Sequence, residues 1–211
     1  MRIVLSSIDD TLAQAWRTYC GDLSGVEFHQ GNILNTKVDA VVSPANSFGF
    51  MDGGIDLVYS QHFGWNVQKQ LQDQIKKFNH GELLVGSADV VETLHSNIPY
   101  LIAAPTMRVP MILLESVNPY LAARAALLLI KHGKFNAGTM VGESISDVVK
   151  SVAFPGLGTG VGRVQPEICA SQVRAAIKEV VFEEFEFPES WSDAQMRHQK
   201  MYTDRFRDLQ F

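Results

Sequence analysis

The sequence has very little cysteine and no long hydrophobic run, and both absences narrow the class of protein. Only Cys20 and Cys169 occur in 211 residues, without a CxxC pair, so a disulfide framework and a thiolate zinc site are disfavoured. We interpret both cysteines as packing residues. The longest apolar stretch, 121–130, is interrupted by Arg124 and is shorter than the ~18 residues of a membrane span. The start MRIVLSSIDD turns acidic too soon for a signal peptide, and we expect a cytoplasmic protein.

Basic residues are also in deficit, because 18 Lys and Arg stand against 23 Asp and Glu, for a net charge of −5. A protein that binds nucleic acid generally needs a basic face, so we expect no such binding. The 6 histidines are scattered without HxH or HExxH spacing, so no metal site is expected, and nothing indicates a cofactor. With 46% apolar and 19% charged residues, the chain is predicted to form a globular domain with a sizeable core.

Short β-rich runs alternate with segments of helical spacing, which predicts an α/β layered sheet. The expected strands are 2–6, 26–29, 40–43, 100–104 and 151–154, with one or two more within 83–95. The expected helices are 9–20, 56–78, 118–131 and 166–182, with Asn118 as an N-cap and Gly21, Gly81 and Gly133 as stops. Ligands of such sheets bind beyond the carboxyl ends of the strands, so the segments after 40–43 and 151–154 are the candidate sites.

The first candidate loop, SPANSFGFMDGGID at 43–56, follows a buried strand and leads into a helix. Gly53 and Gly54 allow a ligand to approach the backbone closely. The free amides and positive dipole of a helix start suit an anion such as phosphate. Asn46 and Asp56 stand at the two ends of the loop, either as ligand contacts or as a turn cap and a helix N-cap.

The second candidate loop, PGLGTGVGRVQP at 155–166, places four glycines between a strand and a helix. Such a loop can cradle a diphosphate with its N–H groups, although glycine-rich loops are also plain tight turns. It is no P-loop, because no GK[ST] follows, and its GxGxGxG spacing differs from the dinucleotide fingerprint. If the two loops face each other across one crevice, a nucleotide diphosphate would fit both.

The order of these motifs resembles the macro domain family, which binds and processes ADP-ribose. The segments that carry the resemblance are QGNI (30–33), VDAVVSPANS (38–47), GGID (53–56) and AFPGLGTGVG (153–162), and it extends from about residue 25 to about 181. It implies a three-layer α/β/α sandwich around a mixed, mostly parallel sheet, with an ADP-ribose cleft at its carboxyl edge. We expect this domain to span 1–187.

The resemblance also implies roles for individual residues. Asn46 matches the asparagine that contacts the distal ribose, and Asp56 matches the aspartate linked to activity in the hydrolytic branch, so these two are the catalytic candidates. The ligand-binding candidates are Asn32, Ile33, Ala45, Gly53, Gly54, Ile55, Gly156, Gly158, Thr159, Gly160, Val161 and Gly162.

Three positions depart from the family pattern. Asn32 stands where the family has an aspartate that accepts a hydrogen bond from the adenine amine, and its amide oxygen accepts without charge assistance. Ser43 replaces the first asparagine of the NAAN motif. Gly162 follows Val161 where many members place an aromatic residue, so another aromatic, Phe48 or Phe50, would pack on the distal ribose.

Three functions remain open. The first is a hydrolase of ADP-ribose-1″-phosphate, O-acetyl-ADP-ribose or ADP-ribosyl esters on protein, and the second is a non-catalytic reader of ADP-ribose. The third is a structural or assembly protein that kept the fold. The extension at 188–211 has no counterpart in the family; we expect a helix packed on the domain, and a partner-binding helix is the alternative. Arg108 is expected to be a surface arginine, with a phosphate contact as the alternative.

Overall fold

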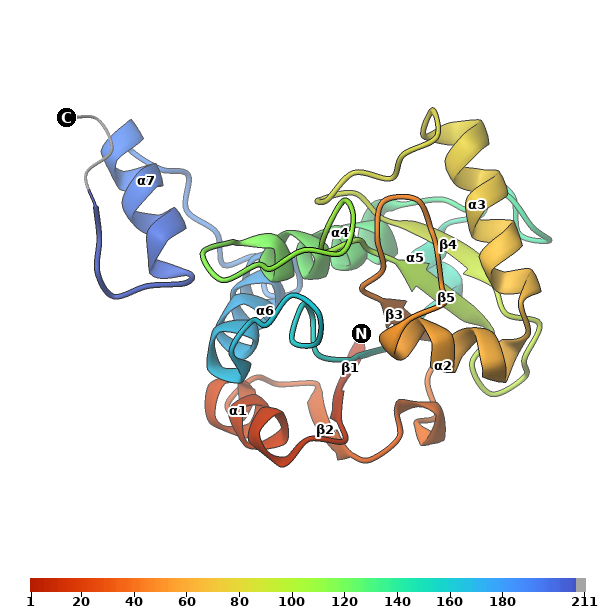
Figure 1. Ribbon diagram of the computed structural model, residues 1–211, viewed down its shortest axis with the longest axis horizontal. Helices are drawn as coiled ribbons and strands as arrows, with labels where there is room; N and C mark the ends of the chain where they lie inside the picture. Colours follow the sequence, from red (N-terminus) through yellow and green to blue (C-terminus); the bar gives the residue numbers. More distant parts are fainter. Residues whose placement is uncertain (208–211) are drawn as a thin grey trace.

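The computed structural model describes residues 1–207, and a central six-stranded sheet organises them (Figure 1). The strands are β1 (Arg2–Ser7), β2 (Val26–Gln30), β3 (Ala40–Ser43), β4 (Asp89–Glu92), β5 (Tyr100–Ala103) and β6 (Ser151–Phe154). Their spatial order is β2-β1-β6-β3-β5-β4. Every neighbouring pair is parallel except β4 and β5, so the predicted mixed, mostly parallel sheet is confirmed.

Helices cover both faces of this sheet (Figure 1). They are α1 (Asp10–Cys20), α2 (Gly54–Phe63), α3 (Asn66–Phe78), α4 (Asn118–His132), α5 (Ile145–Val148), α6 (Pro166–Val180) and α7 (Trp191–Lys200), with a 3-10 turn, η1, at Ile33–Asn35. The strands alternate between two cores: Ile3 and Leu5 pack with α1, α4 and α6, whereas Val4 packs with α2 and α3. Because successive side chains of a strand point to opposite faces, both layers are built from the same apolar runs.

The single helix predicted at 56–78 is wrong, because α2 and α3 are separate. The apolar spacing continues across the break, but Gly64 adopts a φ of 89° and ψ of 151°, which ends the helical backbone. Helix α2 also starts earlier than predicted, with Gly53 at the N-cap position and Asp56 inside the first turn. The alternative of Asp56 as an N-cap is therefore wrong.

Other boundaries differ by less. The region 83–95 contains one strand, β4, and α6 ends at Val180 rather than 182. Asn118 is the first residue of α4, and Val117 occupies the N-cap position instead. The side-chain amide Nδ2 of Asn118 donates to the Thr106 carbonyl at 2.8 Å. The strands at 40–43 and 151–154 agree with the prediction to the residue.

The C-terminal segment leaves the body after α6, and α7 stands off to one side in Figure 1. Gln172 of α6 donates to the Met201 carbonyl at 3.1 Å and so connects the two. Residues 208–211 of the expected extension lie outside the described residues. Among the helices within residues 1–207, none has both the length and the apolarity needed to cross a bilayer.

Candidate functional site

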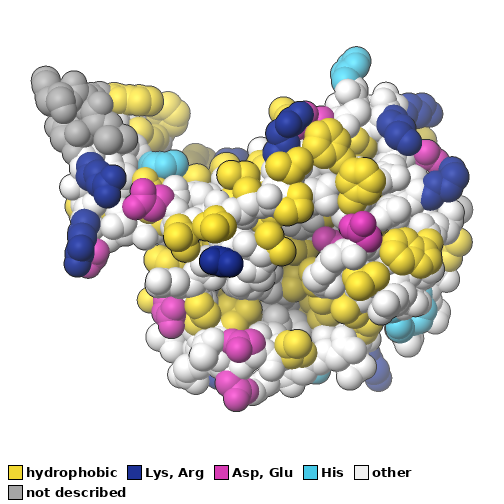
Figure 2. Space-filling model, in the orientation of Figure 1, with side chains coloured by type: hydrophobic (Ala, Val, Ile, Leu, Met, Phe, Trp, Pro, Cys, Tyr) yellow, Lys and Arg dark blue, Asp and Glu magenta, His cyan; other side chains and the backbone are white. Residues whose placement is uncertain are grey.

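The two candidate loops leave the sheet side by side. Strands β3 and β6 are parallel neighbours, so the loops at 44–53 and 155–165 start from the same carboxyl edge. Strand β5 lies on the other side of β3 and adds a third loop, 104–117. Figure 1 shows these loops around the centre of the view, and Figure 2 shows the surface hollowed between them. This carboxyl edge is the candidate site.

The glycine-rich loop after β6 presents a row of unpaired amides. Its shape is held by hydrogen bonds from the Val164 N–H to the Gly158 carbonyl at 3.1 Å and from the Leu113 N–H to the Gly162 carbonyl at 2.8 Å. Within residues 1–207, no acceptor pairs with the backbone N–H groups of 158–162. Backbone donors normally find a partner, so this row of unpaired amides is suited to an anion, and its central residues, 159–161, are accessible from outside.

The glycines of this loop serve different purposes. A Cβ at Gly156 would lie 2.4 Å from the Thr159 Oγ1, and one at Gly162 would lie 2.5 Å from the Gly158 carbonyl oxygen. Gly158 has a φ of 70°, which L-residues rarely adopt. A Cβ at Gly160, in contrast, would have no atom within 4 Å. Three glycines are therefore needed for the loop's own packing, and Gly160 opens onto free space.

The start of α2 supplies a second group of free donors. Its N-cap residue, Gly53, provides no side-chain hydrogen bond. Gly54 has a φ of 55°, and a Cβ there would have no atom within 4 Å. Among the described residues, the N–H groups of 53–56 have no hydrogen-bond acceptor. They add the positive end of the helix dipole to the same edge of the sheet.

The side chain of Asn46 is bound within its own loop. Its Oδ1 accepts from the Phe48 N–H at 3.1 Å and from the Phe50 N–H at 3.3 Å, and its Nδ2 donates to the Phe50 carbonyl at 2.9 Å. The loop geometry is thus the one expected for an asparagine that caps a turn. The second Nδ2 hydrogen is left available to a ligand.

Asp56 is buried near the carboxyl end of β3, where its carboxylate contacts Ser43. Asp56 is only 7% exposed, and its Oδ1 accepts a hydrogen bond from the Ser43 Oγ at 2.5 Å. Burial raises the pKa of Asp56 to about 7, although the Ser43 hydrogen bond lowers it in part. The neighbouring Tyr59 is also buried and donates to the Val42 carbonyl at 3.1 Å. A carboxyl group with a pKa near neutrality can exchange a proton at physiological pH.

The remaining candidates are spread over the edge. Asn32 follows β2 and caps η1, since its Oδ1 accepts from the Leu34 N–H at 3.0 Å. Ile33 and Ala45 are buried, and Ile55 packs against the core on the α2 side. Their side chains therefore serve packing, and any ligand contact would come from the backbone. Thr159 is half-buried, whereas Val161 is 62% exposed.

An apolar rim borders the site, and the sequence motifs did not reveal it. It consists of the exposed large side chains Phe50, Val109, Met111, Ile112, Leu114 and Val161. The Ser47–Arg108 and Leu113–Gly162 backbone hydrogen bonds bring the three loops together, and Figure 2 shows apolar side chains around the hollow. The signal was present in the run VPMILL (109–114), which has no charge and follows a strand.

Two arginines noted in the sequence have acidic partners. Arg108 bonds to both carboxylate oxygens of Glu82, at 2.7 and 3.3 Å, and lies over the Phe48 ring. Its geometry therefore fits the surface interpretation rather than a phosphate contact. Arg124 pairs with Glu179 at 3.3 Å. Within residues 1–207, no three His, Cys, Asp or Glu side chains cluster closely enough to hold a metal ion.

Comparison with known proteins identifies this arrangement. The family model of the macro domain matches residues 42–173, a span that includes both loops and β6. The chain belongs to the macro domain family. This macro domain is 31% identical over 151 residues to an uncharacterised protein of Aquifex aeolicus. The aligned residues make up 72% of this chain and 78% of that protein.

Solved structures share the fold of this macro domain. The macrodomain of Mycobacterium tuberculosis DarG superposes with a TM-score of 0.56 at 20% identity, over 71% of this chain and 88% of that one. Thermosipho africanus DarTG in complex with ADP-ribose gives 0.54 at 15% identity, over 82% of this chain and 50% of that one. At these identities the likeness concerns the fold, and it confirms the α/β/α sandwich.

Proposed function

We propose that this macro domain binds ADP-ribose along the carboxyl edge of its sheet. The observation that carries the proposal is the row of amides at 158–162, which have no acceptor within residues 1–207, together with the free amides at the start of α2. Together they provide neutral donors for a diphosphate without a basic patch. This explains how a chain with a net charge of −5 can bind a strongly acidic ligand.

The order of the strands supports the same ligand. Asn32 follows β2, the glycine loop follows β6 and Asn46 follows β3, and these strands stand in that order across the sheet. The three intervals from β2 to β3 span about 14 Å at ~4.8 Å each. An extended ADP-ribose would place adenine at Asn32, the diphosphate at the glycine loop and the distal ribose near Asn46.

Thermal melting with ADP-ribose tests the binding proposal. Ligand at about 100 times its dissociation constant adds roughly 2.7 kcal/mol, which raises the melting temperature of a chain this size by about 5–10 °C. AMP and ribose-5-phosphate serve as controls and should give smaller shifts. Gly160→Val fills the open space above the loop, so it should reduce the shift while leaving the melting temperature of the free protein unchanged. No shift of the wild type at millimolar ADP-ribose would rule out binding.

We further propose that the domain hydrolyses an ADP-ribose derivative. Asp56, in its ionised form, would accept a proton from a water that attacks the anomeric carbon of the distal ribose, and the bond from that carbon to the leaving oxygen would break. For an acetyl ester on another ribose hydroxyl, the same water would attack the acyl carbon, and the ribose oxygen would leave. Its pKa near 7 suits this task. Asn46 would orient the ribose with its free Nδ2 hydrogen. The candidate substrates are ADP-ribose-1″-phosphate, O-acetyl-ADP-ribose and ADP-ribosyl esters on protein.

Turnover of these three substrates by wild type and Asp56→Asn tests the hydrolase proposal. We expect the variant to lose at least about 100-fold in turnover, the typical contribution of a general base, and to keep its affinity for ADP-ribose. Equal turnover in the two proteins would remove Asp56 from the mechanism.

A specific observation favours a non-catalytic reader as the second candidate. Asp56 is buried and bonded to Ser43, and both polar ends of the Asn46 side chain bind their own loop. If the domain is a non-catalytic reader, the wild type will show a melting shift with ADP-ribose and will release no product from any of the three substrates over hours.

A further inference from the structure

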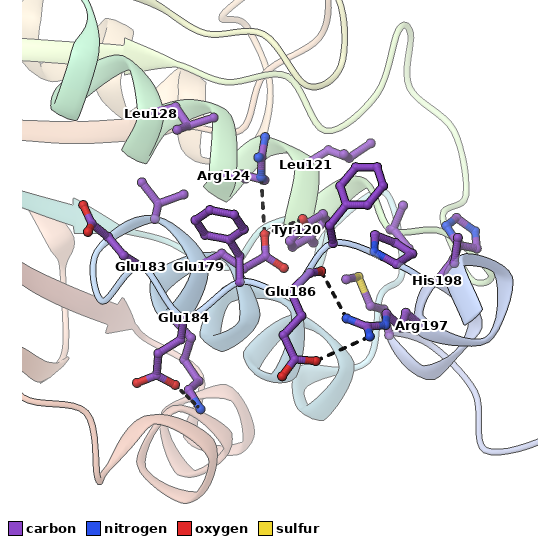
Figure 3. A pocket seen from close by; sticks show the side chains of 18 of the residues that line it. Tyr120, Leu121, Arg124, Leu128, Glu179, Glu183, Glu184, Glu186, Arg197 and His198 are labelled. Atoms are coloured by element: carbon purple, nitrogen blue, oxygen red, sulfur yellow. Dashed lines mark hydrogen bonds and ion pairs between the residues drawn. The ribbon is translucent and has the colours of Figure 1, made fainter. Parts of the chain in front are cut away.

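A groove lies outside the candidate site, between the helical layer and the C-terminal arm, which we define as residues 181–207. It has a volume of about 1060 Å³ and is lined by α4 and α6 on one side and by the arm on the other (Figure 3). On the α4 side, Tyr120 and Arg124 converge on Glu179, at 2.7 and 3.3 Å. Hydrogen bonds between α4 and α6 thus fix the side of the groove that belongs to the body of the domain.

Within residues 1–207, the hydrogen bonds and ion pairs that attach the arm to that body lie near its two ends. Near its start, Glu183 pairs with Lys131 at 2.6 Å and Glu184 pairs with Lys178 at 2.7 Å. Near its end, the Met201 carbonyl accepts from Gln172. Among the described residues, those from 185 to 200 form no hydrogen bond or ion pair with residues 1–180, and Glu186 pairs instead with Arg197 of α7 at 3.4 Å. The middle of the arm is therefore not held to the body by polar contacts.

Three aromatic side chains lie exposed on this middle segment. Phe185 is 71% exposed, Phe187 90% and Trp191 70%. Aromatic side chains bury about 150–250 Å² each, so these three offer roughly 450 Å² per copy. Concentrated apolar surface of this kind marks an interaction site.

The area suits a symmetric pair of copies. Two arms would bury roughly 900 Å² of aromatic surface against a similar area of groove wall, a total of about 1,800 Å², which falls within the range of specific interfaces. The same chain carries both the aromatic residues and the groove. A two-fold axis would therefore place the aromatic residues of each copy against the groove of the other copy.

The charges of the two surfaces are complementary. The arm sequence EEFEFPE at 183–189 contains four glutamates and no basic residue. The opposite wall contains Arg124, Lys131, His132 and Lys178 together with Glu179. Within one copy, Arg124, Lys131 and Lys178 pair with Glu179, Glu183 and Glu184. In the single copy, only the first two glutamates reach this wall, and Glu186 remains 83% exposed at its side chain. Because Arg124, Lys131 and Lys178 keep 44%, 30% and 38% of their side chains exposed in these pairs, the later glutamates of one copy can approach them on the other copy as additional partners.

We propose that this protein forms a two-fold symmetric dimer in which the aromatic residues of each arm lie in the α4–α6 groove of the other copy. The inference is independent of ADP-ribose binding, because the groove lies on the helical layer and not at the carboxyl edge of the sheet.

Sedimentation of the full chain tests the dimer, between about 1 and about 100 µM so that mass action reveals association. We expect the wild type to sediment as a dimer and Phe187→Ser/Trp191→Ser as a monomer throughout. Leu94→Ser is the matched control, since Leu94 is 78% exposed elsewhere, and it should remain dimeric. Glu189→Lys should weaken the dimer at least tenfold.

The melting temperature of each variant shows whether it is folded. Both replaced aromatic side chains are mostly exposed, so the double variant should melt close to the wild type at a concentration where the wild type is monomeric. A wild type that sediments as a monomer at about 100 µM overturns the proposal, and so does a folded double variant that dimerises as well as the wild type.

Discussion

Asp56 shows how one residue acquires its properties from burial. An aspartate in the first turn of a helix normally stays ionised and interacts with the helix dipole. Here the carboxyl group is buried at the end of β3, with the Ser43 hydroxyl as its hydrogen-bond donor. Burial outweighs the hydrogen bond and raises its pKa to about 7. The same environment that suits a proton acceptor also makes ionisation of Asp56 costly for the fold.

The stability of the protein should therefore depend on pH through Asp56. Because the folded pKa is raised from its ordinary value of 3.8, the folded state binds the proton more tightly than the unfolded state. The stabilisation is complete below about pH 4 and is lost as the pH rises through 7. Relative to Asp56→Asn, whose side chain resembles the neutral acid, the wild type should lose on the order of 4 kcal/mol between pH 4 and 8.

Urea unfolding of both proteins across this pH range provides the measurement. Ser43→Ala is the informative companion, because loss of the hydroxyl donor raises the pKa of Asp56 further and moves the transition to higher pH. A constant difference between wild type and Asp56→Asn at every pH would show that Asp56 titrates normally.

At the scale of the element, the loop between β6 and α6 combines a rigid frame with an open surface. Gly158 is packed against Val164 and Leu113, and a Cβ there would lie 3.1 Å and 3.2 Å from their side chains. Within the loop, the Val164 N–H donates to the Gly158 carbonyl and the Arg163 N–H donates to the Gly160 carbonyl. The loop is thus organised before a ligand arrives, which limits the entropic cost of binding.

The two glycines of this loop should respond differently to alanine. Gly158→Ala places a side chain at a left-handed φ and should cost about 1–2 kcal/mol, or about 3–6 °C in melting temperature. Gly160→Ala enters open space at an ordinary φ and should change stability by less than about 0.5 kcal/mol. Melting of the two free variants in parallel makes the comparison, and equal losses would contradict this account of the loop.

At the scale of the whole molecule, the parallel sheet assembles a site from segments far apart in the chain. Strands β3 and β6 are separated by more than a hundred residues but are neighbours, and their loops meet at one edge. Contacts between distant segments also connect the helical layer to the C-terminal arm. Gln172 of α6 accepts from the Tyr120 N–H at 3.0 Å and donates to the Ser116 and Met201 carbonyls at 2.8 and 3.1 Å.

Replacement of this buried glutamine should loosen the connection between helices and arm. Gln172→Leu has a similar volume but leaves one donor and two acceptors unpaired, which should cost about 2–4 kcal/mol. Urea unfolding measures the loss. Gln14→Leu, at an exposed position of α1, is the control and should stay within about 0.5 kcal/mol of the wild type. An equally small effect at Gln172 would mean that water replaces its hydrogen bonds.

Local pattern was sufficient for most elements and for the family. The apolar runs at 40–43 and 151–154 and the glycine at 21 act within a few residues, so periodicity and turn chemistry predicted them. The helix break at Gly64 was missed because the apolar spacing of α2 continues into α3, and spacing alone does not report a left-handed φ. The motif order, a property of the chain itself, also indicated the macro domain.

The remaining features depend on contacts between distant segments, and only the tertiary structure decided them. The salt bridge of Arg108 with Glu82 and the apolar rim each need two or three loops in register. Burial of Asp56 needs helix α2 to pack against the end of β3, where Ser43 lies. Whether an amide is free depends on every acceptor that the fold brings near it, so the glycine pattern predicted a cradle of N–H groups at 158–162 but did not show which of them lack a partner. The sequence by itself determined which elements form, whereas long-range packing determined which of their polar groups remain available.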